Sequence, residues 1–333
     1  MNEVNQIVSD IKSGNAKPIY FLMGEETYYI DKISEYIEQN VLSEEEKGFN
    51  QVVLYGRDVT VDEIISQAKR FPMMAEKTVI VVKEAQDLSR TIEKLVPYVE
   101  NVQPTTVLVI NYKYKTLDKR KKLHKIASKV GVVFESKKLY ENQVADWIRK
   151  VLNTKNYQME PKASQMLVEF LGTNLSKISN ELDKLVLILP AGTIINPQHI
   201  EENIGISKDF NNFELRKALG NRDVLKSNRI INYFSNNPKN NPTVMTVSLL
   251  NSFFTQLLIY HGLKDKSKAN VAKNLGVSPY FVDDYVSASR NYPMRKVSQV
   301  IGFLREADIQ SKGVGASISQ NDLLKELLFK IMH

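Results

Sequence analysis

One short stretch constrains the fold more than any other part of the chain, the run TVIVV from Thr78 to Val82. Every residue in it is β-branched, and polar residues do not alternate with apolar ones. Strands without alternation are buried on both faces, which is typical of parallel sheets covered by helices on each side. The run therefore predicts a core strand of an α/β domain.

Strands and helices alternate throughout the part of the chain before residue 138. Apolar runs predict further strands at residues 18–23, 51–55, 105–111 and 132–134. Helical spacing of apolar residues predicts helices at residues 1–12, 26–40, 61–70, 88–99 and 117–130. Such alternation is typical of a parallel sheet with helices on both faces.

The rest of the chain lacks strand patterns and is predicted to be helical throughout. A chain of 333 residues is also longer than one ordinary core can serve. We therefore expect three domains: an α/β domain over residues 1–138, a small helical domain over residues 139–208 and a longer helical domain over residues 209–333.

The composition excludes several classes of protein. The chain has no cysteine, which excludes disulfides and thiolate metal sites. Its four histidines are scattered without metal-ligand spacing, and no nucleophile motif is present. The sequence indicates neither a membrane span nor a signal peptide, so we expect a cytoplasmic protein without metal or cofactor. The net charge of +7 is compatible with a neighbouring nucleic acid.

An apolar loop, residues 71–74, precedes the core strand. Its members are Phe71, Pro72, Met73 and Met74, and the preceding helix must end before Pro72 because proline disfavours helical geometry in the residue before it. Two interpretations are open. The side chains fold back over the core of their own domain, as apolar residues usually do. Alternatively, they stay exposed and fill a pocket on a partner, a role that suits Phe and Met.

The turn after the first strand occupies the place where nucleotide-binding α/β domains keep a phosphate loop. Such a loop needs glycines and a lysine, whereas here Gly24 is followed by Glu25 and Glu26, which repel a triphosphate. Lys83 stands where an ATPase would hold magnesium with an aspartate. These four residues predict a degenerate site without bound nucleotide. An ordinary strand-to-helix turn, with acidic residues at a helix N-terminus, agrees with the same conclusion.

Two segments have features of DNA-binding elements. Lys119, Arg120, Lys121 and Lys122 lie in the densest positive run, where a solvated helix face is the default interpretation and proximity to DNA the alternative. Residues 270–289 resemble a helix-turn-helix, but the second helix is acidic where phosphate contact needs cations. A packed helical hairpin is the preferred interpretation there, and a DNA-binding regulator is the alternative function.

Six segments occur in order over nearly the whole chain: KPIYFLMGEE (17–26), FPMMAEKTVIVV (71–82), ISNELDKL (178–185), NFELRKALG (212–220), AKNLGVSPYF (272–281) and LREADIQSK (304–312). Taken together, they resemble the delta subunit of bacterial DNA polymerase III, the clamp-opening subunit of the clamp loader.

This resemblance implies an architecture for the three domains. The first would be a degenerate AAA+-like α/β domain, and the second a small helical lid. The third would be a helical collar that assembles with the other loader subunits, gamma or tau and delta prime.

The resemblance also implies a function, that of a subunit of the DNA polymerase holoenzyme without catalytic activity of its own. The apolar loop would insert into a pocket of the sliding clamp, the beta subunit, for loading onto primed DNA. The family has Leu-Phe where this chain has Met73 and Met74, so Phe71 is the candidate for the aromatic anchor. Members of the family do not hydrolyse ATP, which agrees with the missing phosphate loop.

Overall fold

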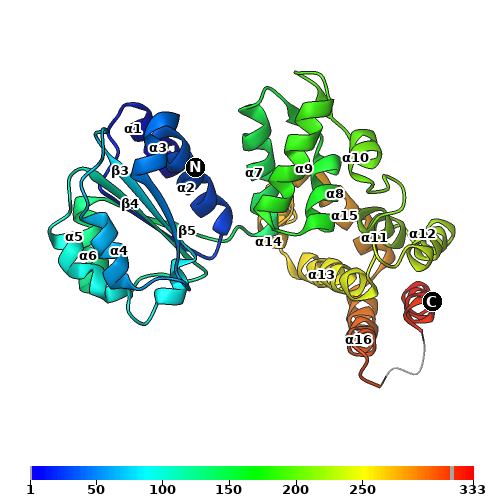
Figure 1. Cartoon of the computed structure of the whole chain (residues 1–333). Helices are drawn as coiled ribbons and strands as arrows, with labels where there is room; N and C mark the ends of the chain where they lie inside the picture. The colour runs from blue at the N-terminus through cyan, green and yellow to red at the C-terminus, as the bar shows by residue number, and fades with distance from the viewer. Residues whose placement is uncertain (1, 316–318) are drawn as a thin grey trace. The chain divides into compact units, whose positions relative to one another are not determined.

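The computed structural model describes residues 2–315 and 319–333, which form two compact units (Figure 1). The first unit comprises Met1–Leu139 and the second Tyr140–His333. The first unit thus ends one residue beyond the boundary expected after residue 138.

A five-stranded parallel sheet forms the centre of the first unit, as the alternation of strands and helices predicts. The strands are β1 (Ile19–Gly24), β2 (Gln51–Tyr55), β3 (Thr78–Lys83), β4 (Thr106–Lys113) and β5 (Val132–Ser136). They lie side by side in the order β2-β3-β4-β1-β5, all parallel. The run from Thr78 to Val82 is therefore an internal strand, and all of it is buried.

Helices cover both faces of this sheet, so the two faces form separate apolar cores (Figure 1). Val79 and Val81 pack into the core under α1 and α2, whereas Ile80 and Val82 pack into the core under α4 and α6. This burial on both faces explains why the run contains no alternation. The helices are α1 (Asn2–Lys12), α2 (Thr27–Asn40), α3 (Glu44–Asn50), α4 (Val61–Ala68), α5 (Val96–Glu100) and α6 (Lys122–Val130), with short 3₁₀ helices η1 (Ala85–Leu88) and η2 (Ile92–Leu95).

Two helical predictions in the first unit were wrong, and one helix, α3, was not predicted at all. The segment predicted as one helix over residues 88–99 is broken into 3₁₀ turns, and α5 begins only beside Pro97, which is favoured in a first helical turn. The helix predicted over residues 117–130 begins at Lys122, because the Asp118 side chain accepts the Arg120 N–H (2.9 Å) and holds a turn there.

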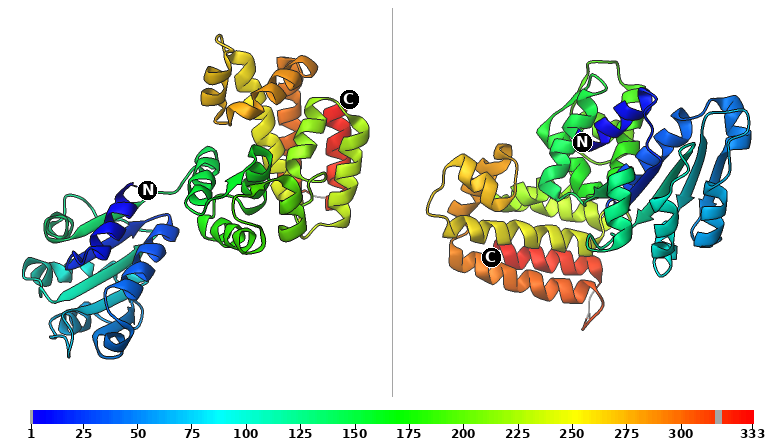
Figure 2. Two further views of the ribbon diagram at one scale, coloured as in Figure 1. Left: turned by 90° about the horizontal axis from the view of Figure 1, so that it is seen from above. Right: turned by 90° about the vertical axis from the view of Figure 1, so that its left-hand side faces the viewer.

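The second unit is almost entirely helical, and α13, α16 and α17 run side by side in it (Figure 2). Its helices are α7 (Glu141–Asn153), α8 (Pro161–Leu171), α9 (Leu175–Ile188), α10 (Pro197–Ile204), α11 (Asn212–Gly220), α12 (Val224–Asn236), α13 (Thr243–Gly262), α14 (Lys268–Leu275), η3 (Pro279–Phe281), α15 (Val282–Asn291), α16 (Met294–Ser311) and α17 (Gln320–Met332). The prediction that strands end at residue 138 was wrong in one detail, since β6 (Gln158–Met159) pairs in parallel with β7 (Ile194–Ile195).

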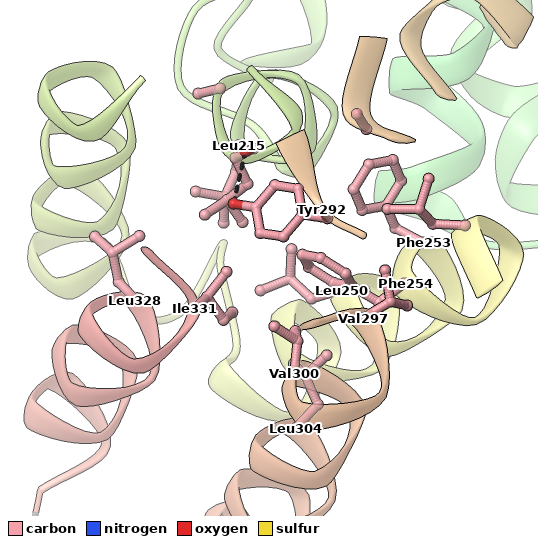
Figure 3. Packing of buried hydrophobic residues seen from close by; sticks show 14 of the residues in the cluster. Leu215, Leu250, Phe253, Phe254, Tyr292, Val297, Val300, Leu304, Leu328 and Ile331 are labelled. Atoms are coloured by element: carbon pink, nitrogen blue, oxygen red, sulfur yellow. Dashed lines mark hydrogen bonds between the residues drawn. The ribbon is translucent and has the colours of Figure 1, made fainter. Parts of the chain in front are cut away.

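The core of the second unit is built around Tyr292 (Figure 3). Its ring meets Phe254 edge-on at a centroid distance of 5.3 Å, and its hydroxyl donates to the carbonyl oxygen of Leu219 at 2.9 Å. Burial raises the pKa of Tyr292 to about 12, so the hydroxyl stays a donor at neutral pH. One side chain thus links α11, α13 and the end of α15.

Helix α13 corrects the expectation that no segment could cross a membrane. Among the described residues it is the one helix whose 20 residues and mean hydropathy of 1.3 suffice by length and composition. Its residues Val247, Leu250, Phe254 and Leu257 are buried in the core of the second unit. This burial accounts for the apolar composition of α13 as that of a core helix.

The boundary predicted between residues 208 and 209 stays a prediction, because residues on its two sides pack within the second unit. Arg216 of α11 forms a buried ion pair with Glu169 of α8. Glu214 of the same helix pairs with Lys162 of α8 at 2.6 Å. The helices on either side of the predicted boundary are therefore tied together by charge.

Candidate docking site

The apolar loop of residues 71–74 lies on the surface of the first unit. Phe71 is 76% exposed, Met73 58% and Met74 102%, and Pro72 is half-buried. The interpretation that these side chains fold back over their own core was therefore wrong. Exposed apolar side chains close together in the chain make this loop a candidate surface for binding another molecule.

The end of α3 positions this loop. The side chain of Asn50 is buried, and its Nδ2 donates to the carbonyl oxygen of Met73 at 2.9 Å. Its Oδ1 accepts the N–H of Met73 at 2.7 Å. Met74 follows with a φ of +56°, a left-handed conformation that is uncommon for a residue other than glycine.

Phe49, the residue before Asn50, is 75% exposed, so an exposed aromatic side chain adjoins in sequence the residue that bonds Met73. The sequence patterns missed it because α3 was not predicted. A signal was present: Ser43 and Glu46 have the spacing of a capping box, and the Glu46 carboxylate accepts both the N–H of Ser43 (2.8 Å) and its hydroxyl (2.9 Å).

The loop that would hold a phosphate uses its N–H groups within the protein. The N–H of Gly24 donates to the carbonyl oxygen of Lys115 at 3.0 Å, and the N–H of Glu26 donates to that of Ser136 at 3.2 Å. Gly24 has a φ of +126°, and a Cβ there would lie 2.1 Å from the Ser136 oxygen. Glycine is thus required by the close approach of β5.

A carboxylate of the chain itself, that of Glu26, lies at the N-terminus of α2. The Glu26 carboxylate caps the helix and accepts the N–H of Tyr28 at 3.0 Å. Burial raises the pKa of Glu26 above its ordinary value, against the opposing effect of this hydrogen bond. Glu25 is exposed. The dipole and N–H groups that attract a phosphate at a helix N-terminus therefore face a carboxylate.

Lysines at the neighbouring strand ends are also engaged by carboxylates. Lys83, at the end of β3, lies 3.3 Å from Glu38 of α2. Lys113, at the end of β4, lies 2.9 Å from Asp31 and 2.8 Å from Glu84. Burial alone would lower the pKa of Lys113, but hydrogen bonds to these two carboxylates raise it. The carboxyl edge of the sheet is thus held by internal ion pairs.

The four basic residues singled out in the sequence are exposed, and each faces an acidic group. Lys119 lies 3.3 Å from Glu135, and Arg120 lies 2.8 Å from Asp118. Lys121 lies 3.9 Å from Glu93, and Lys122 lies 2.6 Å from Glu100. Only Lys122 belongs to α6, so the group is mainly a loop and not a helix face. Its proximity to DNA stays a prediction.

The segment that resembles a helix-turn-helix is part of the second unit's core. Val271 and Leu275 of α14 and Val282 and Tyr285 of α15 are buried there. Asp283, on the helix that would read DNA, pairs with Lys268 at 2.9 Å. These contacts agree with a packed hairpin.

Comparisons with known protein families identify both parts of the chain. The model of the DNA polymerase III delta subunit matches residues 20–137, and the model of the delta subunit's C-terminal domain matches residues 209–330.

The chain belongs to the DNA polymerase III delta subunit family.

Full-length relatives support this membership in the delta subunit family. The DNA polymerase III subunit delta of Bacillus subtilis is 26% identical over 320 residues, which cover 93% of this chain and 92% of the relative. A probable delta subunit of Aquifex aeolicus is 21% identical over 64% of this chain and 62% of its own length. The solved Bacillus subtilis DNA clamp loader delta protein has a TM-score of 0.59 and 25% identity, covering 99% of both chains.

In the first unit, the two sites predicted from the sequence lie at opposite ends of the parallel strands. The apolar loop precedes β3, at the end of the sheet where the strands begin. Gly24 and Lys83 lie at the other end, where β1 and β3 stop. The apolar loop and the turn at Gly24 are therefore separate features of the first unit.

Proposed function

We propose that this chain is the delta subunit of a clamp loader, which binds the sliding clamp through its apolar loop and opens it. The observation that carries the proposal is the exposure of Phe71, Met73 and Met74 on a loop held by Asn50. The family membership and the likeness to a clamp loader delta protein support it.

Opening follows from a difference in affinity. The clamp is a closed ring held by its own interfaces, and a partner that binds the opened ring better shifts it toward opening by no more than that difference. Burial of two or three large apolar side chains would contribute about 1.5–3 kcal/mol each. Only the part of this free energy that differs between the opened and the closed ring would shift the clamp toward opening.

The subunit acts without hydrolysing ATP itself. The N–H groups of Gly24 and Glu26 donate to carbonyl oxygens of the chain, and the Glu26 carboxylate caps α2. Lys83 pairs with Glu38 where a magnesium ligand would be needed. ATP-driven subunits, gamma or tau, would supply the energy and expose or hide the apolar loop.

The helical collar over residues 209–333 would join the other loader subunits, including delta prime. The subunit would act in the cytoplasm. Primed DNA would lie within the loader complex, with Lys119, Arg120, Lys121 and Lys122 as the candidate DNA-proximal residues. Because each of these cations faces a carboxylate, any contact with phosphate would have to compete with an existing ion pair.

The double substitution Met73→Asp with Met74→Asp tests the proposal. Both side chains are exposed, so the fold and its melting temperature should be unchanged. Clamp affinity, measured by surface plasmon resonance with the purified clamp, should fall at least about a hundredfold, because two carboxylates would be buried in an apolar pocket.

Leu187→Asp provides the matched control, because Leu187 is 85% exposed but lies on α9 in the second unit. This variant should bind the clamp as tightly as the wild type. Undiminished clamp binding by the Met73 and Met74 variant would show that the apolar loop is not the docking site.

A further inference from the structure

The side chain of Asn50 forms hydrogen bonds to the backbone of the apolar loop. Asn50 is only 1% exposed, and its amide both donates to and accepts from the main chain of Met73. Within the described part of the chain, these two bonds are the only hydrogen bonds to the backbone of residues 71–76. The hydrogen bonds between the loop backbone and the rest of the domain therefore all come from one side chain.

The geometry of this attachment resembles a pair of residues in a β-ladder. The side-chain amide of Asn50 presents an acceptor oxygen and a donor N–H in one plane, and these pair with the N–H and the carbonyl oxygen of Met73. The second donor of Asn50 Nδ2 is used as well, since it donates to the carbonyl oxygen of Glu46 in α3 at 3.1 Å. Asn50 thus joins the loop to the last turn of a helix.

The attachment fixes the residue that precedes the most exposed one. Met73 is held on both its N–H and its carbonyl group, and Met74 then turns outward in the left-handed region with its side chain fully exposed. A loop with no other backbone bonds would otherwise sample many conformations, and ordering them on binding lowers affinity.

We propose that Asn50 is a positioning residue for clamp binding, which holds the apolar loop in its docking conformation before the clamp arrives. The inference rests on the proposed function, since it concerns how the same surface binds. Asn50 itself is buried and need not touch the clamp. Its contribution is to remove the cost of ordering Met73 and Met74 at the moment of binding.

Hydrogen exchange on the wild-type chain tests the conformation directly. The amide of Met73 should be protected in the free protein, because it donates to a buried acceptor. In Asn50→Ala this amide should lose its protection, while the amides of β3 stay protected. A change confined to the loop is a readout that a general loss of stability would not produce.

Clamp affinity of the same full-length variants tests the consequence. Asn50→Ala should bind the clamp about tenfold more weakly than the wild type, because the loop must then be ordered on binding. Ser34→Ala is the matched control: Ser34 is equally buried, and its hydroxyl bonds Glu38 at 3.1 Å on α2, away from the loop. This control should bind within about twofold of the wild type.

Two results would overturn the inference. One is an unprotected Met73 amide in the free wild-type protein, which decides the matter even if Asn50→Ala fails to fold. The other is wild-type affinity of a folded Asn50→Ala variant. If Met73→Asp with Met74→Asp loses clamp binding while Asn50→Ala keeps it, the docking site stands and only the role of Asn50 is rejected. If the double variant keeps binding, the proposed function itself fails.

Discussion

Glu26 illustrates how one residue can occupy the place of a ligand. Its carboxylate accepts the N–H of Tyr28 at the start of α2, where a nucleotide phosphate would otherwise be expected. Burial raises its pKa above the ordinary value even so. Relative to the protonated form, the ionised form is therefore less favoured in the folded protein than in the unfolded chain. At a pH where the group is ionised, Glu26 thus lowers the free energy of unfolding.

The raised pKa predicts a pH-dependent effect of Glu26→Gln. Well above its ordinary pKa the ionised form of Glu26 is disfavoured by burial, so the amide, which keeps an acceptor for the Tyr28 N–H, should raise the melting temperature at pH 7. As the pH falls through the ordinary pKa of 4.5, the wild-type group becomes protonated in both states, and the gain should shrink. Thermal melts at pH 7 and pH 4 measure the difference. A gain that grows as the pH falls would contradict this assignment.

One residue-level expectation held because a simple steric rule decides it: the helix had to end before Pro72, and α4 ends at Ala68. The absence of bound nucleotide beside Gly24, Glu25, Glu26 and Lys83 stays a prediction. Which way Met73 and Met74 would face could not be predicted, because burial of a loop depends on what packs over it. The deciding contact comes from Asn50, 23 residues away in the chain.

At the scale of elements, α3 is the helix that contributes most to the proposed docking site. It carries both Phe49 and Asn50, and so it supplies an exposed ring and the attachment of the apolar loop. β3 was predictable from its unbroken β-branched run, and α16 from the helical spacing of its apolar residues. A helix as short as α3, with an exposed aromatic residue in its last turn, has no apolar stripe from which to be predicted.

Phe49→Ala tests whether α3 extends the docking surface. Phe49 is exposed, so the substitution should leave the melting temperature nearly unchanged. Clamp affinity should fall by about three- to tenfold, as expected for an aromatic group at the side of a docking site. Surface plasmon resonance against the clamp gives the measurement. Phe329→Ala in α17, at 64% exposure, is the control that should bind normally. Equal affinities of the two variants would confine the site to the apolar loop.

At the scale of the molecule, the parts proposed to bind the clamp and to join the loader belong to different units. The residues of the two cores around the sheet all lie before residue 135, and those of the large helical core all lie after residue 209. No residue is shared between the two sets. The division after residue 138 could be predicted because strand patterns end there, whereas the packing of α8 on α11 could not.

This separation predicts that residues 1–139 fold alone and keep the docking function. The fragment contains the whole sheet, both of its cores, α3 and the apolar loop. Its circular dichroism should show a cooperative melt, and its affinity for the clamp should match that of the full chain. An unfolded fragment would show that the second unit contributes to the stability of the first. A folded fragment without clamp affinity would place part of the docking surface after residue 139.

Separate cores also affect how the chain unfolds on heating. A calorimetric scan of two independently closed units contains two endotherms, and one midpoint then describes neither of them. A substitution at the rim of the sheet displaces only the endotherm of its own unit. The endotherm that a substitution shifts therefore identifies the unit in which it acts, and the size of the shift measures the change in stability.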